Sequence, residues 1–260
     1  MQPRYLRADA TDEISLMHPR FATLLTAALL LGTAWAPSAG ADTPAQVTAM
    51  HAQLTDWPNL ARYRADNAAL PPPTAGQPRV VFMGDSITDR WGRSIGAFFP
   101  GKPYVNRGIS GQTTPQMLLR FMPDVVDLHP RAVVILGGTN DIAGNTGPST
   151  PAMIEDNLAA MIAIARHKGI AVVLASILPV AAYPWRPGIH PAGEIRTLNA
   201  WMRNDCAGGQ CTYLDYYDAM ADPAGGMRPG LSSDGVHPTA AGYAIMGPLT
   251  EAAIARALAH

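Results

Sequence analysis

The chain has 260 residues, of which 48% are hydrophobic, and its formal net charge is −1 at pH 7. This length and composition suit one α/β domain with a sizeable core, and the balanced charge gives no basis for a nucleic-acid partner. Only two cysteines are present, which excludes a disulfide-dense scaffold and a four-thiolate zinc site.

The first 41 residues are typical of an export signal. Residues 21–36 form an apolar, uncharged run about as long as a signal-peptide core and short for a membrane span. The small residues at 39–41 suit signal peptidase, so we place cleavage after Ala41; an uncleaved membrane anchor is the less favoured alternative. Met17 is an alternative start, because acidic residues precede the apolar core in residues 1–16. We expect an exported protein, periplasmic or secreted, with no stable membrane span in its mature form.

The mature chain divides into a helical preamble with a proline-rich linker, residues 42–75, and a main domain, residues 76–260. Apolar residues recur at helical spacing in the preamble and are interrupted at Trp57-Pro58. In the main domain, strand patterns alternate with helix patterns, which predicts a parallel sheet with helices on both faces. The expected strands are 80–83, 104–106, 132–136, 170–177 and 212–214, and the expected helices are 87–90, 95–99, 115–121, 151–167, 195–202 and 239–258.

Polar or glycine-rich clusters follow four of the five expected strands. They are Gly-Asp-Ser at 84–86, the stretch 106–113, Gly-Gly-Thr-Asn-Asp at 137–141 and Asp-Gly-Val-His-Pro at 234–238. The carboxyl ends of parallel strands lie at one edge of a sheet, so we expect these clusters to meet there. Together they offer a serine, a histidine, carboxylates and hydrogen-bond donors, the groups that acyl transfer requires.

Ser86 is the candidate nucleophile of this edge. It follows a buried strand and a glycine turn, and a helix beginning there leaves the Ser86 backbone N–H free to point at a ligand. One residue can then supply both a hydroxyl and an oxyanion donor. The alternative is that Asp85 or Ser86 only caps the helix.

Asp234 and His237 are the candidate acid and base. A serine hydroxyl needs a base, and a separation of three residues on a tight turn lets the Asp234 carboxylate reach Nδ1 of His237, leaving Nε2 for the serine. The alternative is a helix cap and a surface histidine. Gly111 and Asn140 can donate N–H groups to an oxyanion, or they can be ordinary turn residues.

These motifs occur in a fixed order. Gly-Asp-Ser-Ile, Ser110-Gly111, Gly-Gly-Thr-Asn-Asp and Asp-Gly-Val-His-Pro span residues 84–238, and the set resembles the four blocks of the SGNH (GDSL) hydrolases. The resemblance implies a flavodoxin-like, three-layer α/β/α sandwich with about five parallel strands. It also implies a nucleophile, an acid and a base at Ser86, Asp234 and His237, and an oxyanion hole built from Ser86, Gly111 and Asn140. Residues 139–141 are most similar to platelet-activating-factor acetylhydrolases and carbohydrate acetyl esterases.

Three aromatic residues are candidates for contacts with the substrate. Trp91 lies just past the nucleophile helix, and Tyr183 and Trp185 belong to a proline- and aromatic-rich loop at 181–191; packing within the loop is the alternative. Cys206 and Cys211 can form a disulfide in an oxidising compartment. No metal or cofactor motif stands out, so we expect neither.

The sequence therefore predicts an exported serine esterase that hydrolyses short-chain acyl esters, acetyl esters above all, through an acyl-enzyme. Its expected ligand is a small ester of a lipid-like alcohol or an acylated glycan. Two alternatives stay open, an O-acyltransferase with the same triad and a non-catalytic carbohydrate-binding protein. The sequence leaves the acyl length, the alcohol and the oligomeric state open.

Overall fold

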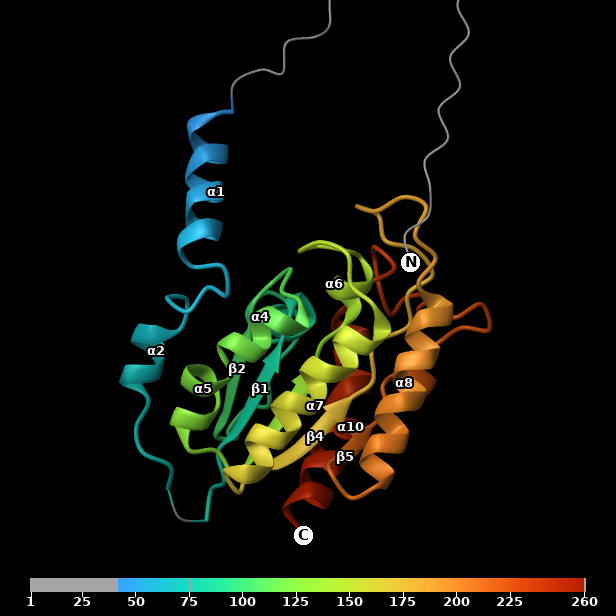
Figure 1. Ribbon diagram of the computed structural model, residues 1–260. Helices are drawn as coiled ribbons and strands as arrows, with labels where there is room; N and C mark the ends of the chain where they lie inside the picture. Colours follow the sequence, from blue (N-terminus) through green and yellow to red (C-terminus); the bar gives the residue numbers. More distant parts are fainter. Residues whose placement is uncertain (1–41, 75, 260) are drawn as a thin grey trace, which may run out of the picture. The chain divides into compact units, whose positions relative to one another are not determined.

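A computed structural model describes residues 42–74 and 76–259 of the protein (Figure 1). The predicted signal peptide, its cleavage after Ala41 and the choice of start codon fall outside these described residues. Within them, no helix combines the length and the apolar character that crossing a membrane would need.

Five parallel strands form the centre of the domain, in the order β2-β1-β3-β4-β5. Their bounds are β1 Val80–Gly84, β2 Tyr104–Gly108, β3 Ala132–Leu136, β4 Ala171–Ala175 and β5 Thr212–Leu214. Strand β1 lies between β2 and β3, and Gly84 is level with both Gly108 and Leu136. The strand order reverses at β1, which is where open α/β sheets bind ligands beyond their carboxyl ends. The predicted flavodoxin-like parallel sheet is confirmed.

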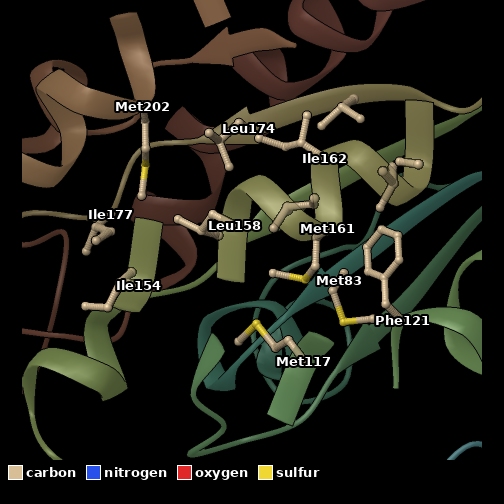
Figure 2. Close-up of a cluster of buried hydrophobic side chains, with 14 of the residues drawn as sticks. Met83, Met117, Phe121, Ile154, Leu158, Met161, Ile162, Leu174, Ile177 and Met202 are labelled. Atoms are coloured by element: carbon tan, nitrogen blue, oxygen red, sulfur yellow. The ribbon is translucent and has the colours of Figure 1, made fainter. Parts of the chain in front are cut away.

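Successive side chains of a strand point to opposite faces of the sheet, and the central strands are apolar on both. Helices therefore cover both faces. Val81 and Met83 of β1 pack into a core under α4 Thr114–Leu119, α5 Phe121–Asp124, α7 Pro151–His167 and α8 Ala192–Ala207 (Figure 2). Val80 and Phe82 pack on the opposite face against α10 Ala240–Leu258. The predicted three-layer α/β/α arrangement is therefore confirmed.

The expected helix at 151–167 forms over those residues as α7. Thr150 caps it by accepting a hydrogen bond from the Met153 N–H, and Pro151 supplies the fixed φ that suits a first turn. Its buried residues recur at helical spacing and form the stripe that packs on the sheet: Ile154, Leu158, Met161, Ile162 and Ala165.

The preamble forms α1 Pro44–Thr55 and α2 Arg64–Ala69, with the interruption at Trp57-Pro58 where it was expected. The carbonyls of Trp57 and Pro58 accept hydrogen bonds from the side-chain amides of Gln116 and Gln112, at 2.7 and 2.8 Å. Tyr63, fully buried, donates its hydroxyl to the Gly108 carbonyl at the end of β2. This segment therefore braces the carboxyl end of β2.

The predicted helix at 95–99 is wrong. The segment after α3, Ser86–Arg90, is a loop in which Gly92 and Gly96 have φ of +78° and +67°. Such angles are incompatible with a helix, and a Cβ at Gly92 would lie 2.3 Å from Cβ of Phe98. The loop instead turns Phe98 and Phe99 onto Phe82 in an aromatic cluster.

Short elements that the sequence patterns did not single out complete the fold. They are α6 Thr139–Ile142, α9 Tyr217–Met220 and the 3₁₀ helix η1 Val126–Leu128.

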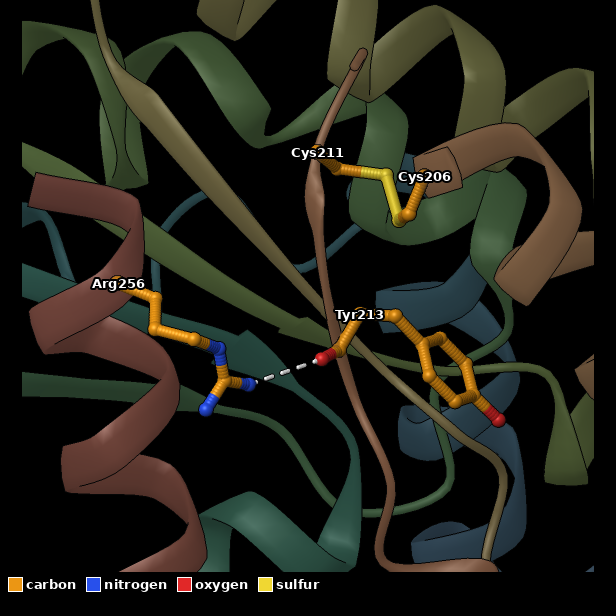
Figure 3. Close-up of a disulfide and its surroundings, with 4 residues drawn as sticks. All are labelled: Cys206, Cys211, Tyr213 and Arg256. Carbon is orange, nitrogen blue, oxygen red and sulfur yellow. Dashed lines mark hydrogen bonds between the residues drawn. A yellow bond between two sulfur atoms is a disulfide. The ribbon is translucent and has the colours of Figure 1, made fainter. Parts of the chain in front are cut away.

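Cys206 and Cys211 are joined by a disulfide (Figure 3). Cys206 lies in the last turn of α8, and Cys211 directly precedes β5. Next along β5, the Tyr213 carbonyl accepts a hydrogen bond of 3.3 Å from Nη2 of Arg256 in α10. The bridge closes the turn at the amino end of β5, at the opposite edge of the sheet from the carboxyl ends of the strands.

Replacing both cysteines by serine should lower stability and leave catalysis unchanged. Closing so short a loop contributes about 2 kcal/mol in the chain-entropy account. For a domain of this size, its loss should lower Tm by roughly 4–8 °C in calorimetry. For the esterase activity that the sequence predicts, kcat and KM well below Tm should stay unchanged, and a large loss of kcat would contradict a purely stabilising bridge.

Candidate active site

Ser86 is the first residue of α3, directly after the carboxyl end of β1. Asp85 caps the helix, accepting the Ile87 N–H at 2.9 Å through Oδ1. Gly84 is required by the close approach of Thr88, since a Cβ there would lie 2.0 Å from Thr88 Oγ1. The Ser86 N–H belongs to the first turn of the helix, where no intrahelical acceptor exists. Both its hydroxyl and its N–H can therefore act on a ligand at this edge.

Ser86, His237 and Asp234 form one chain of hydrogen bonds. Oγ of Ser86 is 2.9 Å from Nε2 of His237, although the residues are 151 positions apart. Nδ1 of His237 is 2.6 Å from Oδ2 of Asp234. The tight turn between acid and base is held by Oδ1 of Asp234, which accepts the N–H groups of Val236 and His237 at 3.0 and 2.8 Å. Gly235 takes a φ of +81° within it.

The charge state of Asp234 follows from these bonds. Partial burial would raise the pKa of Asp234, but the hydrogen bonds from the His237 N–H, the imidazole and the Val236 N–H outweigh it and hold this pKa well below its usual range. The carboxylate is therefore ionised at neutral pH. An ionised acceptor at Nδ1 keeps the proton on that nitrogen and leaves Nε2 as the acceptor for the Ser86 hydroxyl.

Gly111 and Asn140 lie on the loops that follow β2 and β3. Gly111 has a φ of +81° and is exposed. Asn140 is buried in α6, whose N-cap Gly138 has a φ of +116°. Its Nδ2 donates to the Gln112 carbonyl at 2.9 Å and lies 3.4 Å from Oδ2 of Asp85, too long for a strong bond. The nitrogen end of the amide thus faces the two loops that carry Ser86 and Gly111.

Arg120 is a positioning residue that the sequence patterns did not reveal. Its guanidinium is fully buried and donates to the Gly84 carbonyl at 3.0 Å, to the Arg107 carbonyl at 2.7 Å and to Oε1 of Gln112 at 2.5 Å. Asp124 balances the charge at 3.1 Å. The available signal was a cation that directly follows the apolar run Met117–Leu119 of the predicted helix.

Asp141 plays a similar part with the opposite charge. It accepts the Thr114 N–H at 3.0 Å and the Thr114 hydroxyl at 2.6 Å, which joins the loop after β3 to the start of α4. Burial raises the pKa of Asp141, and the hydrogen bonds from Thr114 oppose that shift. Asp85 and Asp141 therefore accept hydrogen bonds from N–H groups in the first turns of α3 and α4, which gives both carboxylates a structural role.

The structure corrects two of the three aromatic contacts. Trp91 is buried in the core beside Tyr243, at 5.0 Å between ring centroids, and its Nε1 donates to the Ala97 carbonyl. Tyr183 is also buried, with its hydroxyl 2.9 Å from Oγ1 of Thr139. Phe98, Phe99 and Tyr243 pack around the first ring, and the second residue is only 1% exposed, with its ring 5.3 Å from that of Trp185 between centroids.

Trp185 is the aromatic residue that stays at the site. Its side chain is 40% exposed, and its ring lies 6.3 Å from the His237 imidazole between centroids. Its Nε1 donates to Oδ1 of Asn145 at 3.1 Å. A hollow of about 360 Å³ opens beside Asp234, lined by Ala181, Ala182, Tyr183, Pro184, Asp222, Gly226, Met227, Asp234 and Gly235. Among residues 42–74 and 76–259, no cluster of side chains is suited to bind a metal ion.

Comparisons with known proteins point to one family. The model of the GDSL-like lipase/acylhydrolase family matches residues 82–245. The structure of a GDSL-like lipase from Bacteroides thetaiotaomicron is 43% identical, with a TM-score of 0.75 over 78% of this chain and 100% of that chain. That of a candidate platelet activating factor from Streptococcus pneumoniae is 26% identical, with a TM-score of 0.64 over 81% and 99% of the two chains.

A curated relative is similar over a shorter stretch. The uncharacterized lipoprotein YqeF of Bacillus subtilis is 37% identical over 79 residues, which are 29% of this chain. The matched stretch spans 32% of that relative.

The buried Asp85 should make stability depend on pH. Burial raises the pKa of Asp85 to about 7; the Ile87 N–H opposes this shift and the Asp141 carboxylate adds to it. An unfolded aspartate has a pKa of about 3.9, so the folded state binds the extra proton between these values. The stability gained by protonating Asp85 in the folded state is complete below about pH 4 and is lost as pH rises towards 7. In urea unfolding, the free energy of wild type minus that of Asp85→Asn should fall across this window. A flat difference would contradict the raised pKa.

Proposed function

This chain belongs to the GDSL-like lipase/acylhydrolase family, a family of carboxylic ester hydrolases, and we propose that it is a serine esterase for short-chain acyl esters, acetyl esters above all. The resemblance to SGNH (GDSL) hydrolases is thus confirmed. The observation that carries the proposal is the hydrogen-bonded series Ser86–His237–Asp234 at the switch point of the sheet. The three residues have the geometry of a nucleophile, a base and an orienting acid.

The first half-reaction forms an acyl-enzyme. Ser86 Oγ attacks the carbonyl carbon of the ester while Nε2 of His237 takes the hydroxyl proton, and Asp234 stabilises the imidazolium. The tetrahedral intermediate carries a negative oxygen. When it collapses, the bond to the alcohol oxygen breaks, and His237 returns its proton to the leaving alcohol. Ser86 then holds the acyl group.

The second half-reaction releases the acid. Water attacks the acyl carbon, His237 again takes a proton, and the bond to Ser86 Oγ breaks as the proton passes to it. In the alternative O-acyltransferase, a sugar hydroxyl replaces this water and the same three residues act unchanged. The third candidate, a non-catalytic carbohydrate-binding protein, is disfavoured because it has no use for a serine and a histidine 2.9 Å apart.

We assign the oxyanion to three donors: the N–H groups of Ser86 and Gly111 and the Nδ2 of Asn140. All three lie in the segments that directly follow β1, β2 and β3, whose carboxyl ends are level with one another. Donors fixed before the reaction stabilise the negative oxygen without reorganising.

Two features support a small, polar alcohol such as a sugar. The hollow beside Asp234 mixes polar with apolar walls; neither Ser86 nor His237 lines it, so it suits only a part of the alcohol that lies away from the ester bond. The exposed ring of Trp185 lies at the edge of the triad, where it can stack on a sugar ring or pack against an acyl group. A lipid-like alcohol with a short acyl chain fits the same features.

Export is supported by the apolar run at 21–36 with its small-residue exit, by the disulfide, and by the similarity to a protein named as a lipoprotein. We propose a periplasmic or secreted location for the mature protein.

The assay that tests this function compares p-nitrophenyl acetate with longer p-nitrophenyl esters and with acetylated xylan. We expect the acetyl esters to be turned over fastest. Ser86→Ala should keep the fold and lose several orders of magnitude in kcat, because nucleophile and base act as a unit.

Three outcomes decide between the candidates. Activity of Ser86→Ala close to wild type would overturn the triad. Turnover that rises with acyl length would overturn the acetyl preference. Transfer of most acyl groups to an added sugar, measured as acylated sugar against free acid, would identify a transferase.

Asn140 should matter for catalysis more than for binding. Asn140→Ala should lower kcat by about 10²–10³, because one oxyanion donor is lost. KM should change little, since this interaction strengthens in the transition state. Asn140→Asp should be at least as damaging, because it places an acceptor beside a developing negative charge. A rise in KM alone, with kcat preserved, would make Asn140 a substrate-binding residue.

A further inference from the structure

We propose that Asn145 is a positioning residue that determines which end of the Asn140 amide faces the reaction, and that Trp185 determines the orientation of Asn145 in turn. The inference rests on the proposed role of Asn140 as an oxyanion donor and goes beyond it. It assigns a catalytic consequence to two residues outside the triad and the oxyanion hole.

An oxyanion hole that uses an asparagine has to solve an orientation problem. The oxygen and nitrogen ends of a primary amide have nearly the same shape, but one only accepts hydrogen bonds and the other only donates. Half a turn of the Asn140 amide would place Oδ1 where Nδ2 now lies. It would then repel the developing oxyanion that it should stabilise.

The contacts of Asn140 favour one orientation. Its Nδ2 donates to the Gln112 carbonyl at 2.9 Å, and its Oδ1 accepts from Nδ2 of Asn145 at 2.8 Å. A half-turn of Asn140 alone would place oxygen against oxygen at Gln112 and nitrogen against nitrogen at Asn145. Both hydrogen bonds would be lost.

The partner amide could turn as well, so Asn145 needs an anchor of its own. Trp185 supplies it, because its Nε1–H donates to Oδ1 of Asn145 at 3.1 Å and an indole nitrogen can only donate. The series therefore begins at a group that only donates, Trp185, and ends at a group that only accepts, the Gln112 carbonyl. Two amides between such ends have a single arrangement in which every contact is a hydrogen bond.

The backbone keeps Asn145 in place for this task. Its N–H donates to the Asn140 carbonyl at 3.0 Å, and its Nδ2 also lies 3.4 Å from the Gly111 carbonyl. Asn145 thus contacts the loops that carry two of the proposed oxyanion donors. It lies five residues after Asn140, beyond the motif at 137–141, and the sequence analysis assigned it no role.

The test is the near-isosteric variant Asn145→Asp, assayed with p-nitrophenyl acetate. The new carboxylate can still accept from Trp185 but cannot donate to Oδ1 of Asn140, so the Asn140 amide should turn. We expect kcat and kcat/KM to fall by about 10- to 100-fold, the loss that small misplacements of catalytic groups cause, with little change in KM. Asn145→Ala should lose less, since it removes the preference without reversing it.

Coupling to Asn140 separates positioning from a general structural effect. In the Asn140→Ala background, Asn145→Asp should lower kcat by less than about twofold, because the amide that it acts through is gone. Trp185→Phe keeps an aromatic ring but removes the pyrrole part of the indole with its N–H, and it should give a smaller loss of kcat that also disappears in that background.

Arg186→Ala is the matched control. Arg186, next to Trp185, also ties the 181–191 loop to the segment before Asn145, because its Nη2 donates to the Gly144 carbonyl at 3.1 Å. It takes no part in the series of amide hydrogen bonds. Its kcat should stay near wild type, and equal losses in Arg186→Ala and Asn145→Asp would assign the effect to loop anchoring.

The remaining outcomes are separable. Wild-type kcat in Asn145→Asp, or a full loss on top of Asn140→Ala, would overturn the inference while leaving the triad intact. If Asn140→Ala itself keeps wild-type kcat, both the proposed oxyanion role and this inference fall, and Ser86→Ala still reports on the triad alone.

Discussion

The position of every proposed catalytic group depends on how the loops at one edge of the sheet are held, and Arg120 holds two of them. Its fully buried guanidinium binds the last carbonyl of β1, a carbonyl of β2 and the side chain of Gln112. A buried cation is costly unless each donor is paired, so its partners cannot drift without leaving a charge unsatisfied. Gln112 is also the residue whose carbonyl receives the Asn140 amide. One cation thus links the nucleophile turn to the proposed oxyanion hole.

The proposed triad combines one contact between residues close in sequence with one between residues far apart in sequence. Asp234 and His237 meet within one turn, and backbone N–H groups fix that turn around the carboxylate. The contact of His237 with Ser86 joins residues 151 positions apart, and α10, which begins at Ala240 shortly after His237, packs on the sheet. The Tyr243 hydroxyl of α10 strengthens that packing by donating to the Ile87 carbonyl in α3 at 2.7 Å. Packing of the hydrophobic core therefore helps to keep Ser86 and His237 within hydrogen-bond distance.

Sequence reasoning predicted what local patterns determine. The strands 132–136 and 212–214 and the helix 151–167 form over the predicted residues, because apolar runs, caps and prolines mark them directly. Strand β2 continues past the predicted end, and the buried Arg107 in it finds polar partners inside the fold: its Nε donates to Oδ1 of Asn67, and its guanidinium lies over the Tyr63 ring. Trp91 was assigned to the site because it lies close to Ser86 in sequence. Its partners in space are core aromatic residues, which the sequence did not reveal.

The surroundings of Asn140 show how burial can serve an anionic transition state. Oδ2 of Asp85 lies 3.4 Å from Nδ2 of Asn140 and would compete with an oxyanion for this donor if Asn140 has the role proposed above. A fully ionised carboxylate there would bind the amide strongly and repel the developing charge. Burial instead raises the pKa of Asp85 to about 7, so a large fraction of it is neutral near neutral pH. The 3.4 Å contact is what a weakly competing acceptor should make, and it leaves the second N–H of Asn140 available for the proposed oxyanion.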